Sequence, residues 1–395
     1  MKNEKFKSRW HALGMLSVAL ACSTVSAAEV KVGVLALFSG PYSWWGQQYQ
    51  QGIDLALAEV NGTVAGHKIT VLTRDEGGVN PQRVKQLAQE LIVRDKVQYL
   101  AGGVLTPTVI AAAPVINEAK IPYVIMNSGT TAVTKMSPYF VRAGVTQWSL
   151  NVPLAKWAYA QGARKASIAV ADFAPGQDAL ESFSKTFKEL GGEIVSEVKI
   201  PLNTVDFSSY MQKLRDDKPK YVFTFMTLGP MSIGFTKAIK DAGLDKTGMK
   251  FLYTTELSDS DLPPLGDQAN GLISSLHYGP YLSSKRNAEF VKGIKAKFGK
   301  DELPSMATLA AYDAMQLIFQ MVRATNGVQD TDKAMASLKG FKLDSPRGPV
   351  VIDDKREMVQ NIYIRRVEKM PDGKYGNKDI FTYPAVKEPW YEANP

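Results

Sequence analysis

Apolar runs alternate with amphipathic stretches along this chain, and the first such unit is Val30 to Val60. The apolar run from Val30 to Phe38 predicts a strand that is covered on both faces, as in a parallel sheet. Ser39-Gly40-Pro41 ends this strand, because proline cannot donate a ladder hydrogen bond and glycine permits a sharp turn. The helix expected after Gly46 buries one face, made of Tyr49, Ile53, Leu57 and Val60.

The same strand-then-helix order continues to the polar loop at residues 127–131 and restarts near Gln147. Further strands are expected at residues 68–73, 97–101, 121–126, 166–171, 193–200, 221–226, 250–254 and 271–276. Helical stretches over residues 286–324 then precede a β-like alternation at 361–367 and a proline- and aromatic-rich tail. This rhythm is typical of doubly wound parallel sheets with helices on both faces.

A chain of 395 residues is too long for one simple core, so the restart predicts two α/β lobes joined by chain crossings. Lobe 1 is expected to hold residues 29–146 and 276–348. Lobe 2 is expected to hold residues 147–275 and 349–395.

Residues 1–28 have the pattern of a secretory signal peptide. Four basic residues precede the apolar run 12–21, and Ser26-Ala27-Ala28 supplies the small residues of a cleavage site. The run is too short to span a bilayer. Cys22, the only cysteine, follows Ala19-Leu20-Ala21 rather than the leucine pattern of lipoproteins, so we expect no lipid anchor. The mature chain is then expected to be periplasmic and to contain no disulfide.

The net charge of +8 falls to +5 without this leader, whose four basic residues and Glu4 sum to +3. Lysines 292, 295, 297 and 300 lie along a helical stretch without interleaved aromatic residues, as on a solvated face. Nucleic acid is therefore not an expected partner. No later segment has the apolar length of a membrane span.

Residue patterns that support catalysis or metal binding are missing from the sequence. His11 lies in the leader, His67 lies in a glycine-flanked turn, and His277 stands alone. There is no metal-ligand spacing, no serine in a nucleophile elbow, and no phosphate-binding glycine loop. We therefore expect no enzymatic activity, no metal and no cofactor.

Two groups of side chains at strand carboxyl ends suggest a binding site, because open α/β sheets bind ligands at that edge. The first is Tyr42, Trp44 and Trp45, expected in the loop after the first strand. These rings could instead cover the local core. Two adjacent tryptophans cannot easily both enter one core, so at least one is expected to face a cleft.

The second group is a set of hydroxyl side chains that precede helices: Thr106, Ser128, Thr130 and Thr131. Their hydroxyls and backbone N–H groups could converge with the positive ends of helix dipoles and bind a carboxylate. The alternative is that each hydroxyl caps its own helix.

Several segments together resemble one family. VKVGVLALFSGP, the GGVLTP and NSGTT loops, and SPRGPVVID with QNIYIRR are similar to the branched-chain-amino-acid-binding family of solute-binding proteins that serve ATP-driven importers. The resemblance covers essentially all of the mature chain. It implies the type I periplasmic-binding-protein fold, with two lobes, three hinge crossings and a ligand in the cleft.

The resemblance also implies roles for single residues. Trp45 matches an aromatic residue after the first turn, and Thr106, Ser128 and Thr130 match the clamp for a ligand carboxylate. Phe173, Met226 and Thr227 fall among side-chain-pocket positions, and Glu256 falls near the acidic residue that pairs with a ligand ammonium. For an aromatic ligand, the additional stacking candidates are Trp44 and Tyr278.

The chain departs from the family pattern in ways that concern the ligand. Leu105 stands where some members have a disulfide cysteine, and the pocket positions are more aromatic than a leucine site needs. PGQDA and SPRGP resemble a subgroup that takes aromatic carboxylates. A hydrophobic amino acid is the default ligand, and an aromatic acid is the second candidate.

These observations predict a monomeric, non-enzymatic receptor that delivers a small carboxylate to an ABC permease and ATPase. A ligand sensor on the same fold, feeding a regulator or receptor, is the alternative. A hydrolase would need a nucleophile and a base, which the sequence does not offer.

Overall fold

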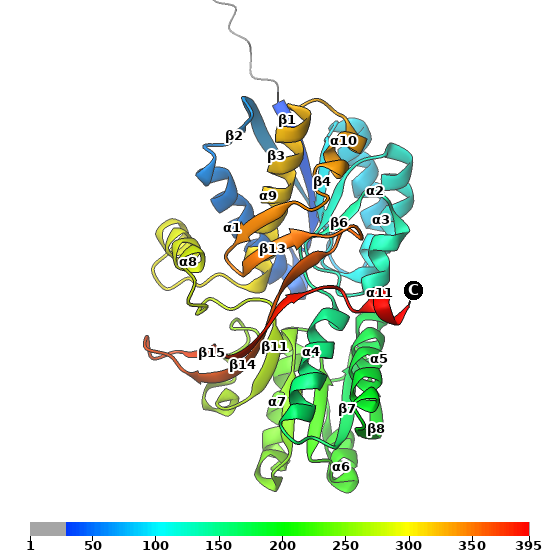
Figure 1. The fold of residues 1–395 in the computed structure, drawn as a ribbon, viewed down its shortest axis with the longest axis vertical. Helices are drawn as coiled ribbons and strands as arrows, with labels where there is room; N and C mark the ends of the chain where they lie inside the picture. The colour runs from blue at the N-terminus through cyan, green and yellow to red at the C-terminus, as the bar shows by residue number, and fades with distance from the viewer. Residues whose placement is uncertain (1–28, 395) are drawn as a thin grey trace, which may run out of the picture.

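The computed structural model describes residues 29–394 (Figure 1). The expected signal peptide, with Cys22, lies outside the described residues. The strands are β1 (Glu29–Ala36), β2 (Thr63–Val64), β3 (His67–Asp75), β4 (Tyr99–Gly102), β5 (Tyr123–Ile125), β6 (Phe140–Arg142), β7 (Lys165–Ala171), β8 (Glu193–Ile200), β9 (Tyr221–Phe225), β10 (Lys250–Tyr253), β11 (Ile273–Leu276), β12 (Lys342–Ser345), β13 (Gly348–Ile352), β14 (Met358–Lys369) and β15 (Tyr375–Val386). The α-helices are α1 (Ser43–Glu59), α2 (Pro81–Gln89), α3 (Thr106–Ala119), α4 (Gln147–Ala160), α5 (Ala174–Glu189), α6 (Ser208–Asp217), α7 (Pro230–Asp241), α8 (Lys285–Phe298), α9 (Met306–Thr325), α10 (Thr331–Ala336) and α11 (Trp390–Ala393).

Within the described residues the strands form two sheets; the first lies in the upper half of Figure 1, and the second lies mainly in the lower half, with its β13 end in the upper half. The first has six strands in the order β2-β3-β1-β4-β5-β6, and β3, β1, β4, β5 and β6 pair in parallel. The second has nine strands in the order β12-β13-β14-β11-β10-β9-β7-β8, with β15 paired to β14. Its strands from β11 to β8 are parallel, and β14 is antiparallel to β11. The prediction of two doubly wound α/β lobes is therefore confirmed.

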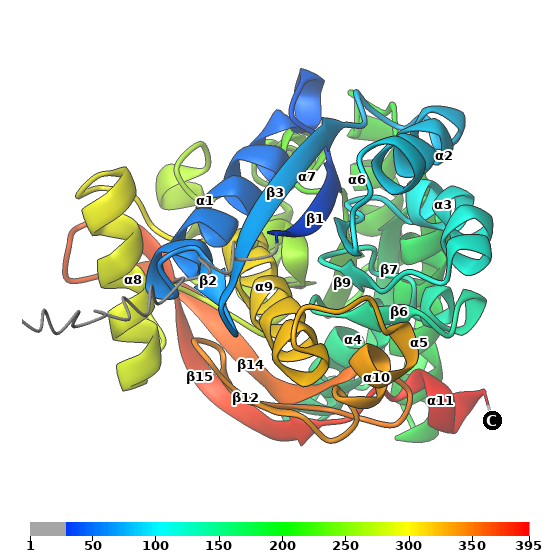
Figure 2. The same ribbon diagram turned by 90° about the horizontal axis from the view of Figure 1, so that it is seen from above.

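Helices cover both faces of each sheet. Figure 2 shows α1 and α9 on one side of the first sheet and α2 and α3 on the other. Helices α1 and α9 approach closely at Gly52, where a Cβ would lie 2.1 Å from the carbonyl oxygen of Thr308. On the second sheet, α4 and α5 contribute Leu154 and Phe183 to one core, and α6 and α7 contribute Met211 and Phe235 to another.

The chain passes between the two lobes after β6, after β11 and between β13 and β14 (Figure 1). Buried ion pairs lie at these passages. Arg142 pairs with Glu357 at 2.8 Å, and Arg347 pairs with Asp313 at 2.8 Å, with every partner at most 2% exposed. Because a buried charge is strongly disfavoured without a partner, each pair fixes the two segments that it joins. The boundaries expected for the lobes stay predictions.

Two of the differences between the structure and the sequence-based expectations concern the first helix and the tail. Trp44 and Trp45 lie in the first turn of α1, which begins at Ser43, and not in a loop. The proline- and aromatic-rich tail forms β15, an unpredicted strand that pairs antiparallel with β14. Beyond β15 the chain returns to the first lobe, where Trp390 lies under the ammonium of Lys135 at 4.4 Å.

Candidate functional site

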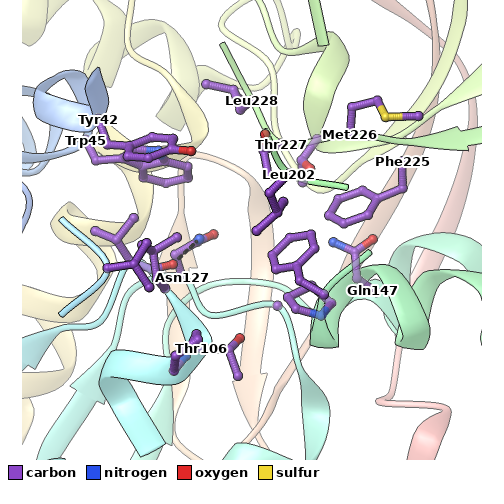
Figure 3. A pocket seen from close by; sticks show the side chains of 18 of the residues that line it. Tyr42, Trp45, Thr106, Asn127, Gln147, Leu202, Phe225, Met226, Thr227 and Leu228 are labelled. Carbon is purple, nitrogen blue, oxygen red and sulfur yellow. Dashed lines mark hydrogen bonds between the residues drawn. The ribbon is translucent and has the colours of Figure 1, made fainter. Parts of the chain in front are cut away.

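A cavity lies between the two lobes and is formed by loops at the carboxyl ends of the strands (Figure 3). It holds about 940 Å³ of empty space, its open side included. This size falls in the range of small-molecule sites. Among residues 29–394, no Asp, Glu, Lys, Arg or His lines the cavity. The described residues also hold no cluster of His, Cys, Asp and Glu suited to a metal, and no helix with the length and apolarity of a membrane span.

The wall from the first lobe comes from the segments after β1, β4 and β5. It contains Tyr42, Trp45, Val104, Leu105, Thr106, Pro107, Asn127 and Gly129. The turn after β4 depends on glycine: Gly102 has φ +125°, and a Cβ there would lie 1.9 Å from the carbonyl oxygen of Leu35. This close passage over β1 brings Thr106, the first residue of α3, to the cavity.

Three of the predicted clamp hydroxyls are hydrogen-bonded to one another. Ser128 Oγ donates to Thr106 Oγ1 at 3.1 Å, and Thr106 Oγ1 donates to Thr130 Oγ1 at 3.3 Å. Thr106 lines the cavity, while Ser128 and Thr130 lie directly behind it and are buried. Thr106 also begins a 14-residue helix, whose amino end carries a partial positive charge, although Pro107 has no N–H and the N–H of Thr108 donates to the Leu105 carbonyl at 3.2 Å. This end of the cavity is suited to a carboxylate, toward which the Thr106 hydroxyl would turn its one proton from Thr130.

Arg142 organises the loop behind these hydroxyls. Its guanidinium donates to the carbonyl oxygens of Asn127 at 3.2 Å, Thr130 at 3.0 Å and Thr131 at 3.4 Å, and also to that of Ser128. In a trans peptide the C=O and the following N–H point in opposite directions. The Ser128 carbonyl faces Arg142, so the N–H of Gly129, which lines the cavity, points away from Arg142.

Acidic side chains close this network from behind. Thr131 N–H donates to Asp178 at 3.2 Å, and Thr131 Oγ1 donates to Glu388 at 3.4 Å. Burial raises the pKa of Asp178 to about 6. Burial, together with the nearby Glu357, raises the pKa of Glu388 to about 8. Residues 127–131 form the clamp loop. Thr131 therefore supports this loop and does not line the cavity.

The wall from the second lobe is apolar and aromatic. Phe173 and Phe225 stack with ring centroids 5.9 Å apart and planes 10° from parallel. Both line the cavity, and Met226, Thr227 and Leu202 belong to the same wall. Gln147, the first residue of α4, lies beside Phe225 in Figure 3.

Glu256 lies in the second lobe but does not line the cavity. Its Oε2 accepts hydrogen bonds from the N–H of Thr254 at 3.0 Å and from Thr254 Oγ1 at 2.8 Å, and its Oε1 accepts from Thr224 Oγ1 at 3.2 Å. The side chain is 2% exposed, and burial raises its pKa to about 7. The neighbouring Thr255 lines the cavity instead.

The two additional stacking candidates, Trp44 and Tyr278, also lie outside the cavity. Trp44 packs edge-to-face on Trp45 at 5.3 Å and lines a separate cleft with Gln48 and Leu262. Tyr278 is buried in the core of the first lobe, and its hydroxyl donates to Asn287 Oδ1 at 2.9 Å. The predicted residues that the structure brings together around the cavity are Trp45, Thr106, Phe173, Met226 and Thr227.

Sequence reasoning did not select Asn127, Gln147, Leu202 or Phe225 as site residues, although all four line the cavity, as does Tyr42 of the first predicted group. Asn127 begins the polar loop 127–131 that the sequence shows. Gln147 directly follows Thr146, the capping residue of α4, so the start of that helix was the available signal. Leu202 is 45% exposed on a loop and gives no sequence signal.

Comparisons with known proteins place this geometry in context. A family model described as "Periplasmic binding protein" matches residues 29–374. The chain is 40% identical over 385 residues to the Leu/Ile/Val-binding protein homolog 6 of Brucella melitensis, an alignment that covers 97% of this chain and 99% of the relative.

Two solved structures from Rhodopseudomonas palustris are similar along almost the whole chain. The solute-binding protein of an ABC transporter from strain HaA2, in complex with p-hydroxybenzoic acid, has 43% identity and a TM-score of 0.89, covering 93% of this chain and 100% of its own. A second one, from strain BisB5 in complex with 3,4-dihydroxybenzoic acid, has 38% identity and a TM-score of 0.87, covering 92% and 99%.

Proposed function

The chain belongs to the periplasmic binding protein family, and on that premise we propose that it captures a small aromatic carboxylate as the solute-binding component of an ABC importer. Its fold is that of the type I periplasmic binding proteins. The proposal rests above all on one observation: among the described residues, the interlobe cavity is lined by aromatic rings and by hydroxyl and amide groups, and by no charged side chain.

This lining favours an aromatic acid over an amino acid. The ammonium of a buried amino acid needs a carboxylate partner, because an unpaired buried charge is strongly disfavoured. Glu256, the acidic residue that the family resemblance implied for this role, is turned into the second lobe and is already hydrogen-bonded there. An aromatic acid needs only a carboxylate site, which the start of α3 offers, and a ring site, which Phe173 and Phe225 offer.

Capture is proposed to occur by closure of the two lobes around the ligand. The carboxylate site and the ring site belong to different lobes, so a ligand contacts both only when the cleft is closed. Val79 and Leu202 line the cavity from opposite lobes and are 58% and 45% exposed, so closure has apolar surface on both lobes to bury. Small-angle scattering should show a smaller radius of gyration for the ligand-saturated protein. An unchanged radius in a sample with confirmed binding would contradict closure.

The remaining parts of the proposal follow the transport role. The partners are an ABC permease and ATPase, the location is the periplasm after removal of the leader, and the receptor acts as a monomer without catalysing a reaction. A permease-containing membrane preparation should respond to the liganded protein with increased ATP hydrolysis. A response that does not depend on the ligand would contradict delivery.

The experiment for the ligand class is calorimetric titration of the mature protein with benzoate, 4-hydroxybenzoate, leucine and valine. We expect heat of binding from the aromatic acids and none from the amino acids at the same concentrations. Tight binding of leucine, lost in Glu256→Gln, would instead restore the amino-acid assignment.

A further inference from the structure

Gln147 turns the donor end of its amide toward the interlobe cavity. The side chain is 3% exposed and lines the cavity. Figure 3 shows the amide nitrogen on the cavity side and the amide oxygen on the far side. The oxygen is buried and has no hydrogen-bond partner among the described residues. A ligand in the cavity therefore meets Gln147 Nε2, whose two N–H groups can only donate.

The same amide lies against the clamp loop. The backbone N–H of Gln147 donates to the carbonyl oxygen of Gly129 at 3.0 Å. A Cβ built on Gly129 would lie 3.2 Å from Gln147 Nε2, so this nitrogen is close to the glycine. Gly129 also lines the cavity, and its N–H points away from Arg142. Gln147 Nε2 and the Gly129 N–H are therefore neighbouring donors at the clamp loop.

The surroundings favour a negatively charged acceptor for Gln147 Nε2. Gln147 is the first residue of α4, a 14-residue helix, so its amide lies near the partially positive end of that helix. Among residues 29–394, no Asp or Glu lines the cavity, so the protein supplies no ionised acceptor there. The carboxylate of an aromatic acid is an acceptor only, and it forms stronger hydrogen bonds than a neutral group does.

We infer that Gln147 is a further ligand-binding residue, whose Nε2 donates to the ligand carboxylate as a third donor beside Thr106 Oγ1 and the Gly129 N–H. This inference rests on the proposed function, because it assumes that an aromatic carboxylate occupies the cavity. Gln147 follows the chain crossing after β6, so this hydrogen bond ties the bound carboxylate to the crossing as well as to the clamp loop.

The test is calorimetric titration of the parent protein, Gln147→Met and Gln147→Glu with benzoate and 4-hydroxybenzoate at neutral pH. Methionine has about the length of glutamine but no N–H to donate. In Gln147→Met the affinity should fall by about ten- to a hundredfold. The factor should be the same for both acids, because they share the carboxylate and differ only at the ring. Gln147→Glu should lower both affinities further, because it places a second carboxylate beside that of the ligand.

The same helix supplies a matched control. Asn151 lies one turn after Gln147 on α4, is 0% exposed and does not line the cavity. Its Nδ2 donates to Ser182 Oγ at 3.1 Å, so Asn151→Leu should lose stability and keep the affinity for both acids. Gln147→Met retains the backbone hydrogen bond to Gly129 and removes an unpartnered oxygen. Its melting temperature without ligand should therefore not fall below that of the parent.

The outcomes distinguish this inference from the proposed function. Parent-like affinity of Gln147→Met or Gln147→Glu for both acids would overturn the inference alone. So would a loss confined to 4-hydroxybenzoate, which would assign Gln147 Nε2 to the ring hydroxyl. A melting temperature of Gln147→Met as low as that of Asn151→Leu would overturn it as well, because Gln147 would then act through the structure. Absence of binding of both acids to the parent would overturn the proposed function itself.

Discussion

The two walls of the interlobe cavity recognise a ligand by different physical means. The wall from the first lobe contains Thr106 and Gly129, whose N–H points away from Arg142, on a loop held in place by the buried Arg142 and Glu357. The wall from the second lobe presents stacked phenylalanines, and its nearby acid, Glu256, is turned inward. One wall therefore provides directed donors, and the other provides apolar area.

This difference shows where fixed geometry is needed. A carboxylate is bound well only by donors that already point at it, so the first lobe surrounds its loop with a buried charged network. A ring is held by area and stacking, which tolerate small displacements. Substitutions in the first wall should therefore lower the affinity for the ligand more than substitutions in the second wall.

The largest effect is expected from Arg142→Met. It removes the guanidinium that binds the clamp-loop carbonyls and leaves Glu357 buried without its ion partner. Breaking a buried pair costs about 3–5 kcal/mol of stability, and we expect aromatic-acid binding to be lost in the protein that remains folded. Denaturant unfolding and titration of the folded protein measure the two effects.

Arg347→Met is the control for Arg142→Met. It breaks an equally buried pair, Arg347 with Asp313, at a place that does not touch the clamp loop. Its stability should fall by a similar amount while the affinity stays close to that of the parent. Equal loss of affinity in both variants would mean that Arg142 acts only through overall stability.

The next effect is expected from Thr106→Ala. A hydrogen bond to a charged group contributes about 1.5–3 kcal/mol, so affinity for an aromatic carboxylate should fall by about ten- to a hundredfold. Thr108→Ala is the control, because this hydroxyl lies in the same helical turn but donates to the carbonyl of Leu105. If Thr106→Ala lowers the melting temperature and leaves affinity intact, Thr106 is a structural residue.

A smaller effect is expected from Phe173→Leu in the second wall. An aromatic stack contributes about 0.5–1.5 kcal/mol beyond its buried area, so affinity should fall by about two- to tenfold for every aromatic acid. Phe183→Leu removes a similar stack, with Phe223 at 4.4 Å, inside the second lobe. The Phe183→Leu variant should lose stability and keep its affinity. A Phe173→Leu variant that loses stability and keeps its affinity would show that Phe173 does not contact the ligand.

The smallest effect on affinity is expected from Glu256→Gln, which should change the binding of an aromatic acid by less than about twofold. The same substitution should alter the pH dependence of stability. The pKa of Glu256 is raised to about 7 in the folded protein from 4.5, so the folded state holds the extra proton. Its contribution to stability is therefore present below pH 4.5 and is lost as the pH rises to about 7. Unfolding free energies measured across this range should fall less steeply in Glu256→Gln than in the parent.

Much of the fold could be predicted because most strands from β1 to β11 are short, apolar and followed by a helix. The predicted strand at residues 193–200 has the same bounds as β8. β6 was missed because its three residues end in Arg142, whose charge is accepted only through Glu357, 215 residues later in the chain. β15 was missed because it pairs only with β14, exposes Phe381 and contains Pro384, which is tolerated on an unpaired edge.

The site was predictable where a residue follows a strand directly, as Thr106 and Phe173 do. It was not predictable where a side-chain direction depends on one turn. Thr255, Glu256 and Leu257 form a single 3₁₀ turn after β10, which brings Thr255 to the cavity and buries Glu256. Composition gives no sign of that choice, whereas for Gln147 the start of α4 was an available signal.

A crystal structure of the mature protein with 4-hydroxybenzoate tests the central claim most directly. The difference between the two walls predicts the ligand carboxylate within hydrogen-bond distance of Thr106 Oγ1 and the Gly129 N–H, with its ring packed on Phe173 and Phe225. A ligand in the opposite orientation, with its carboxylate on the phenylalanine wall, or a ligand bound outside this cavity, would contradict the account.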